Sequence, residues 1–212
     1  MPRFPLNIFH LFNKKTIKQM NSIITIVSGL PRSGTSLIMR MLEAGGMEVV
    51  KDDIRKADED NPNGYYEFEK VKRIKEDSSW LDSTRGKVFK MVSMLLSDLP
   101  ADKNYKVIFM KRNMHEMLTS QRIMLERRGS DKGRVNDGEM GRLYDKHLTQ
   151  IKRWLETQDN MDVLYVSYND VIESPRENTE IVNQFLGNRL DVERMVKIVD
   201  KSLYRNRANA GN

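Results

Sequence analysis

Short apolar runs alternate along the chain with segments whose apolar residues recur at helical spacing. Runs rich in β-branched and aromatic residues predict four strands, at residues 23–27, 88–92, 105–110 and 164–166. The first run has no apolar–polar alternation, which is typical of a strand buried on both faces of a parallel sheet. Residues 47–50 predict a further short strand.

Helical periodicity follows the first strand and returns later in the chain. It runs from residue 37 until Gly45 and Gly46 end it, and it recurs around residues 116–126 and 143–155. Short helical patterns fill residues 168–200. Strands that alternate with helices predict an α/β domain, with a mostly parallel central sheet between two helical layers (α/β/α).

Polar segments and the two ends mark the boundaries of this domain. Residues 51–64, which end in Asn-Pro-Asn-Gly, and residues 127–138 predict exposed loops. Residues 1–21 are predicted to be an extension helix packed on the domain, and the alternative is docking to a membrane surface or a partner. Residues 204–212 are predicted to be a weakly ordered tail, which leaves one domain over residues 22–203.

Composition narrows the chemistry. The 212 residues contain 36 Lys and Arg against 30 Asp and Glu, a net charge of +6, which suits anionic ligands without demanding nucleic acid, and we expect no nucleic-acid partner. The chain has no cysteine and only three histidines, so we expect no disulfide, no cysteine nucleophile and no metal site. No apolar run approaches the roughly 18–20 residues that cross a bilayer, and we expect a cytoplasmic protein.

Residues 29–36 carry the main candidate chemistry. They read Gly-Leu-Pro-Arg-Ser-Gly-Thr-Ser between a predicted strand and a predicted helix, a frame in which backbone N–H groups cradle phosphate-like anions (a P-loop). A nucleotide triphosphatase would place a lysine where Thr35 stands, and here Arg32 carries the charge instead. A purely structural strand–helix turn is the alternative.

This loop resembles the first loop of the sulfotransferases that use 3'-phosphoadenosine 5'-phosphosulfate (PAPS), which reads Pro-(Lys/Arg)-(Ser/Ala)-Gly-Thr-(Thr/Ser). It looks most like the arginine-containing loops of the tyrosylprotein and bacterial branches. The resemblance implies a P-loop fold and a loop that holds the 5'-phosphosulfate through Pro31, Arg32, Ser33, Gly34, Thr35 and Ser36.

Two further stretches are similar to the same family. Arg112, after a predicted strand, is followed eight residues later by Ser120, and the resemblance implies that both bind the 3'-phosphate. Eight residues place Ser120 about two helical turns into the next helix, so both side chains reach one phosphate only if the chain doubles back through a short loop. Residues 163–187 resemble a third family stretch, which implies that Tyr168 lies near the adenine; a core or capping role is the alternative.

The chain departs from the family pattern at the catalytic base. Cytosolic members carry Lys-Thr-His in the middle strand, and here Val92 stands at the histidine position while Lys90 remains as a candidate cation near the sulfuryl group or a merely exposed charge. Glu67 follows a stretch similar to Asn-Pro-Lys-Gly-(Phe/Tyr)-x-Glu of bacterial members. The resemblance makes Glu67 the candidate base, with Asp52, Asp53 and Glu69 as the next candidates and a structural salt bridge as the alternative.

The family's C-terminal cofactor clamp, Arg-Lys-Gly, is absent, and Arg205 or Arg207 is the candidate substitute. The resemblance implies metal-free transfer of a sulfuryl group from PAPS to an acceptor hydroxyl, or less favourably an amine, with release of adenosine 3',5'-bisphosphate (PAP). Arg32 would neutralise the charge that grows on the leaving phosphate. The acceptor stays open among small molecules, glycans, lipids and peptides, and the oligomeric state is open too. The alternatives are a P-loop kinase, which lacks its lysine here, and a non-catalytic nucleotide-binding protein.

Overall fold

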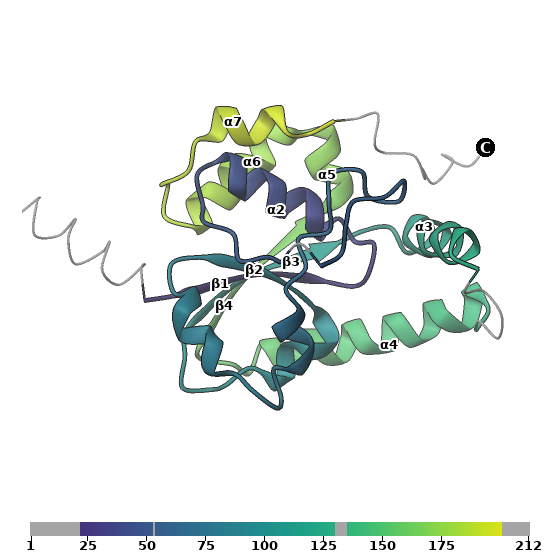
Figure 1. Ribbon diagram of the computed structural model, residues 1–212, viewed down its shortest axis with the longest axis horizontal. Helices are drawn as coiled ribbons and strands as arrows, with labels where there is room; N and C mark the ends of the chain where they lie inside the picture. The colour runs from purple at the N-terminus through teal and green to yellow at the C-terminus, as the bar shows by residue number, and fades with distance from the viewer. Residues whose placement is uncertain (1–21, 53, 130–134, 201–212) are drawn as a thin grey trace, which may run out of the picture.

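The computed structural model describes residues 22–52, 54–129 and 135–200 (Figure 1). Its centre is a sheet of four parallel strands in the order β2-β1-β3-β4. The strands are β1 (Ile24–Gly29), β2 (Val88–Val92), β3 (Tyr105–Lys111) and β4 (Met161–Ser167). The predicted extension and tail, residues 1–21 and 204–212, lie outside the described residues, as does part of the predicted 127–138 loop.

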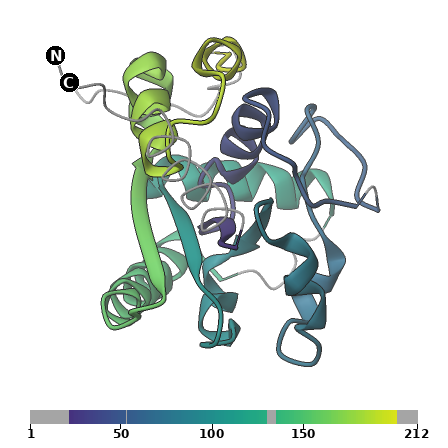
Figure 2. The ribbon, with the colours of Figure 1, turned by 90° about the vertical axis from the view of Figure 1, so that its left-hand side faces the viewer.

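Both faces of the sheet are covered, as the apolar runs predict. Ile24 and Ile26 of β1 pack on one side, and Val27 packs on the other, because successive side chains of a strand point to opposite faces. One side carries α2 (Thr35–Ala44), α5 (Tyr168–Glu173), α6 (Pro175–Phe185) and α7 (Val192–Lys197). The other carries α4 (Asp137–Leu155) and three 3-10 helices, η1 (Glu69–Arg73), η2 (Ser79–Thr84) and η3 (Ser93–Asp98) (Figures 1 and 2). The three-layer α/β/α prediction is confirmed.

The predicted strand at residues 47–50 is wrong. Only a single bridge joins Val49 to Val88 of β2, although Val50 N donates to Val88 O at 2.8 Å and Val88 N donates to Glu48 O at 2.9 Å. The chain leaves the sheet edge at once, because Asp52 N donates instead to Glu67 O at 2.8 Å. The segment therefore starts the loop that leads to the site.

The carboxyl ends of the three adjacent strands meet at one edge of the sheet. Gly29 at the end of β1 is in register with Val92 of β2 and Met110 of β3. A Cβ at Gly29 would lie 2.8 Å from Met110 O, so this close approach requires glycine. In open parallel sheets this edge is where ligands bind.

Helix α3 (Met114–Arg127) begins at the same edge, directly after β3. Asn113 caps it by accepting a hydrogen bond from Glu116 N at 3.2 Å. Its apolar residues Met117 and Leu118 pack against Leu30 and Tyr144. Within the three described stretches, no helix is long and apolar enough to cross a bilayer.

Candidate active site

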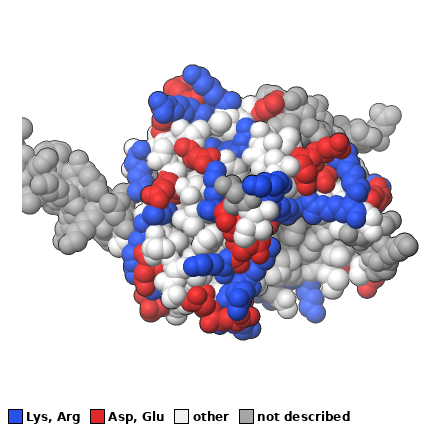
Figure 3. Space-filling model, viewed as in Figure 1, with Lys and Arg blue, Asp and Glu red and all other residues white. Residues whose placement is uncertain are grey.

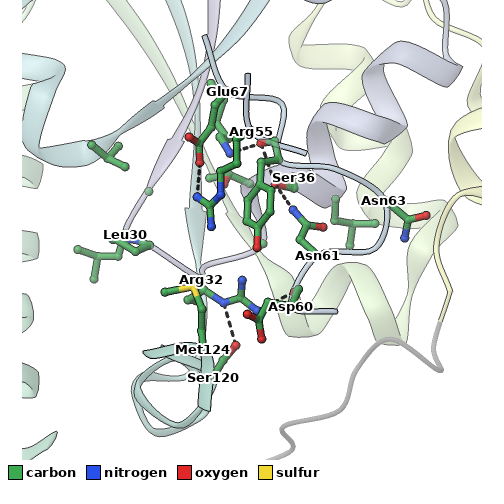
Figure 4. Close-up of a pocket in the computed structure, with 18 of the residues that line it drawn as sticks. Leu30, Arg32, Ser36, Arg55, Asp60, Asn61, Asn63, Glu67, Ser120 and Met124 are labelled. Atoms are coloured by element: carbon green, nitrogen blue, oxygen red, sulfur yellow. Dashed lines mark hydrogen bonds and ion pairs between the residues drawn. The ribbon is translucent and has the colours of Figure 1, made fainter. Parts of the chain in front are cut away.

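A cavity of about 570 Å³ opens at the carboxyl edge of the sheet (Figure 4). Its walls come from the loop after β1, the irregular segment before η1, the end of β2, and α3. The predicted site residues that line it are Pro31, Arg32, Gly34, Thr35, Ser36, Glu67, Lys90, Arg112, Ser120 and Tyr168. Ser33 lies in the same loop, and Arg205 lies outside the described residues.

The loop between β1 and α2 has the backbone of an anion cradle. Gly34 has a φ of 98° and precedes the first helical residue, Thr35. The first N–H groups of a helix have no acceptor within the helix, and Gly34 offers no side chain to cap them. Ser33 Oγ is buried and has no hydrogen-bond partner among the described residues. The loop therefore presents donors that an anion would satisfy.

Arg32 crosses the cavity. Its Nε donates to Ser120 Oγ on α3 at 2.9 Å, and its Nη2 donates to the backbone oxygen of Asp60 at 3.0 Å. Burial lowers the pKa of Arg32, and the neighbouring charge of Asp60 acts in the opposite direction. The backbone φ of 68° is unusual for a residue other than glycine, and strain of this kind persists where surrounding contacts hold it.

Arg112 contacts the backbone of the loop at residues 29–36. Its Nη1 donates to Arg32 O at 3.1 Å, and its Nε pairs with Glu116 Oε2 at 3.2 Å, where the two side chains are 8% and 2% exposed. Arg112 and Ser120 thus both contact Arg32, so the chain doubles back between them as their spacing requires. Sequence reasoning missed Glu116, which lies four residues after Arg112 at the start of the predicted helix over residues 116–126.

The ring of Tyr168 packs against the loop at residues 29–36. Its ring lies 4.3 Å from the Arg112 guanidinium carbon, and a Cβ at Gly34 would lie 2.3 Å from its Cδ2. Burial raises the pKa of its phenol. In the described structure the ring fills the space against Gly34, and the adenine role of Tyr168 stays a prediction.

Lys90 lies inside β2 and is mostly buried rather than exposed. Its ammonium donates to the backbone oxygen of Tyr65. Burial lowers its pKa to about 8; Glu67 acts in the opposite direction, and the cations Arg55 and Arg32 lower the pKa further. These charges therefore share one region of the cavity.

Glu67 lines the cavity and also forms the salt bridge that was the alternative to the base role, and the base role stays a prediction. Its Oε1 accepts from Arg55 Nη1 at 2.6 Å, and its Oε2 lies 3.8 Å from Lys72 Nζ. Asp52 and Glu69, also named for the base role, do not line the cavity: Asp52 accepts from two backbone N–H groups, and Glu69 pairs with Lys72. Asp53 lies outside the described residues.

Segment 58–64, part of the exposed loop predicted over residues 51–64, covers part of the loop at residues 29–36. Arg127 and Arg128 at the end of α3 pair with Asp60 at 2.9 Å and Asp58 at 3.0 Å. From the same segment, Asn61 Nδ2 donates to Ser36 Oγ at 3.2 Å. Sequence reasoning missed these contacts; the only signal was an acidic run followed much later by an Arg-Arg pair.

Neither histidine of the described stretches lines the cavity. His147 Nε2 lies 2.9 Å from Ser93 Oγ, and burial lowers the pKa of its ring. Val92, at the position where the resemblance places a histidine, is 39% exposed at the cavity wall. Among the described residues that line the cavity, the candidate proton acceptors are therefore carboxylates, lysines and tyrosines.

Fold and site together define an α/β protein of the P-loop class with a cationic cavity for a phosphate-like ligand. A family model described as "Sulfotransferase domain" matches residues 23–209, and the chain belongs to this family, whose function is sulfuryl transfer from PAPS. The predicted membership of the sulfotransferase family is thereby confirmed. A search among curated proteins found no match.

Solved structures with similar folds include two sulfotransferase domains. The domain from the curacin biosynthetic pathway is 15% identical with a TM-score of 0.52, over 89% of this chain and 93% of that one. The domain from the olefin synthase of Synechococcus PCC 7002 is 15% identical with a TM-score of 0.50, over 89% of each chain. At this identity the likeness shows the fold alone.

Proposed function

We propose that this chain binds PAPS in the cavity and transfers its sulfuryl group to an acceptor hydroxyl. The observation that carries the proposal is the convergence of Arg32, Lys90 and Arg112 on one cavity with an anion-binding loop that lacks the kinase lysine. PAPS supplies the sulfuryl group when bound, and PAP is the other product. Membership of the sulfotransferase family favours this function over that of a P-loop kinase.

The chain's donors fit such a ligand. The N–H groups at the start of α2, the hydroxyls of Thr35 and Ser36, and the buried, unpartnered Ser33 Oγ would hold the 5'-phosphosulfate. Arg112 and Ser120 would hold the 3'-phosphate. Arg32 already bonds to Ser120 and its backbone oxygen to Arg112, so it links the two anion sites.

Glu67 is the proposed general base. It would take the proton of the acceptor hydroxyl as that oxygen bonds to sulfur and the bond from sulfur to the phosphate oxygen breaks. Its Oε1 is held by Arg55, which leaves Oε2, with only the 3.8 Å contact to Lys72, as the oxygen that receives the proton. Arg32 and Lys90 would stabilise the negative charge on the departing phosphate.

Part of the cavity wall is apolar, and it bears on the acceptor. Leu30 and Met124 lie on the side of Arg32 away from Asn61 and Asn63 (Figure 4). Other apolar residues of the cavity are Phe68, Val71, Met91, Val92, Leu95 and Ile123. We infer that the acceptor hydroxyl is carried by an apolar group, as in a phenol or a long-chain alcohol, because such a wall offers no hydrogen-bond partners to a sugar ring.

Ligand binding tests the proposal before any acceptor is known. In a thermal-shift titration without Mg²⁺, PAP should raise the melting temperature in proportion to the logarithm of its concentration. Stabilisation by ATP with Mg²⁺ but not by PAP would favour the kinase reading. Stabilisation by neither would favour a scaffold that kept the fold.

A further inference from the structure

Arg55 comes from the irregular segment before Glu67 and has no assigned role. Its Nη1 donates to Glu67 Oε1 at 2.6 Å, and its guanidinium carbon lies 3.3 Å from the centre of the Tyr65 ring. The salt bridge and the ring fix the guanidinium in two directions, although the side chain as a whole is 30% exposed. Arg55 is therefore a preorganised cation on the cavity wall.

The second terminal nitrogen of this guanidinium is unsatisfied. Arg55 Nη2 is buried and has no hydrogen-bond partner among the described residues. An unpaired buried donor is unfavourable, and more so on a charged group, and an anion bound at this nitrogen would satisfy it. In Figure 4 the guanidinium lies beside Glu67, on the side toward Arg32.

The charges around Arg55 favour an anion there. The positive charge of Arg55 lies close enough to lower the pKa of both Lys90 and Arg32. The charge of Lys72 also lowers the pKa of Lys90. Glu67 is the carboxylate that pairs with Arg55, and the carboxylate of Asp60 is taken by Arg127. Positive charge thus exceeds negative charge in this part of the cavity.

We propose that Arg55 binds the sulfuryl group that is transferred, with Nη2 donating to a sulfuryl oxygen while Nη1 holds Glu67. The inference rests on the proposed function. It explains how a base outside the P-loop is placed at the reaction centre: one guanidinium contacts both the base and the group to which the acceptor oxygen bonds. An anionic group on the acceptor is the competing partner for Nη2.

Comparison of PAPS with PAP tests this contact, because PAP has both phosphates but no sulfuryl group. Isothermal titration of the full-length protein without acceptor should give a PAPS affinity at least tenfold lower for Arg55→Gln than for the wild type, with PAP affinity within threefold. Arg55→Lys keeps the positive charge but loses the second terminal nitrogen. Its PAPS affinity should therefore lie between those of the wild type and Arg55→Gln. Arg73→Gln, which removes an exposed guanidinium paired only with Glu76, is the matched control and should change neither affinity.

The other outcomes overturn the inference in distinguishable ways. An equal loss of PAPS and PAP affinity in both Arg55 variants would make Arg55 a residue that merely supports the fold. Unchanged binding of both ligands together with a raised acceptor KM would assign Nη2 to the acceptor. Failure of the wild type to bind either ligand would instead contradict the proposed function, and this inference with it.

Discussion

At the residue scale, substitution of Arg112 tests most clearly whether this residue binds the 3'-phosphate of the cofactor. Arg112→Ala should weaken PAP binding by about 2 kcal/mol, the worth of a hydrogen bond to a charged group, while adenosine 5'-phosphosulfate, which lacks the 3'-phosphate, should bind nearly as before. Calorimetry with both ligands measures the difference.

Glu116 complicates that substitution, because it is 2% exposed and would lose its ion pair. The double variant Arg112→Ala/Glu116→Gln also removes the buried negative charge of Glu116 and serves as the control for folding. Equal affinity losses for both ligands in the double variant would show that Arg112 only supports the loop.

The lowered pKa of Lys90 predicts that kcat/KM depends on pH. Burial lowers its pKa to about 8, so its positive charge is present below that pH and lost above it. If the charge stabilises the leaving group, kcat/KM should fall as pH rises through about 8, because this ratio reports the free enzyme. Lys90→Arg should move the fall to higher pH, since arginine stays protonated. An alkaline limb that is unchanged in the variant would remove Lys90 from the chemistry.

Site residues within short local patterns could be predicted from the sequence, and those from irregular segments could not. The loop at residues 29–36 and the Arg112–Ser120 pair have fixed spacings that survive without an alignment. Arg55 and Asn61 reach the cavity from a segment without periodicity, so only the fold shows that they face Glu67 and Ser36. The support of Gly34 by Tyr168 joins residues 134 positions apart and has no sequence signal either.

At the element scale, the junction of β1, loop and α2 depends on Gly34. Gly34→Ala adds a Cβ 2.3 Å from the Tyr168 ring in a left-handed conformation, whereas Gly46→Ala has a similar φ of 95° and open space. Gly46→Ala should cost about 1–2 kcal/mol of unfolding free energy for the backbone alone. Gly34→Ala should cost about 1–3 kcal/mol more for the clash and should also lose PAP binding.

Urea unfolding of both variants measures these costs. Equal destabilisation would show that the Tyr168 ring moves aside freely and does not fix the loop. Loss of PAP binding by Gly46→Ala as well would show that the effect is not local to the loop.

The regular elements were predictable because their patterns repeat. All four strands of the sheet and the helices at residues 35–44 and 114–127 lie where the periodicity places them, with ends shifted by up to three residues. The helix predicted over residues 143–155 begins six residues earlier, at Asp137, within the predicted loop of residues 127–138. The three 3-10 helices between residues 69 and 98 are too short for a period to show. Residues 47–50 read as a strand but pair with β2 only at Val49, because β-branched composition does not reveal where a strand leaves the sheet.

At the scale of the whole molecule, the net charge of +6 is not gathered into one field on the face shown. Figure 3 shows Lys and Arg interspersed with Asp and Glu on that face. In the cavity, Arg32, Arg55 and Lys90 meet in partly buried surroundings, where charge interactions are stronger than at the surface, and there they attract an anionic donor.

Transfer of labelled sulfate from PAPS tests the central claim most directly. The wild type and Glu67→Gln are incubated with [³⁵S]PAPS and a panel of phenols, long-chain alcohols, glycans and peptides. We expect the wild type to label a phenol or long-chain alcohol, and Glu67→Gln to lose roughly 10²–10⁴-fold in kcat with PAP affinity within about threefold. No labelled acceptor in any class from a wild type that binds PAP would contradict sulfuryl transfer, and near-full activity of Glu67→Gln would contradict the assignment of the base.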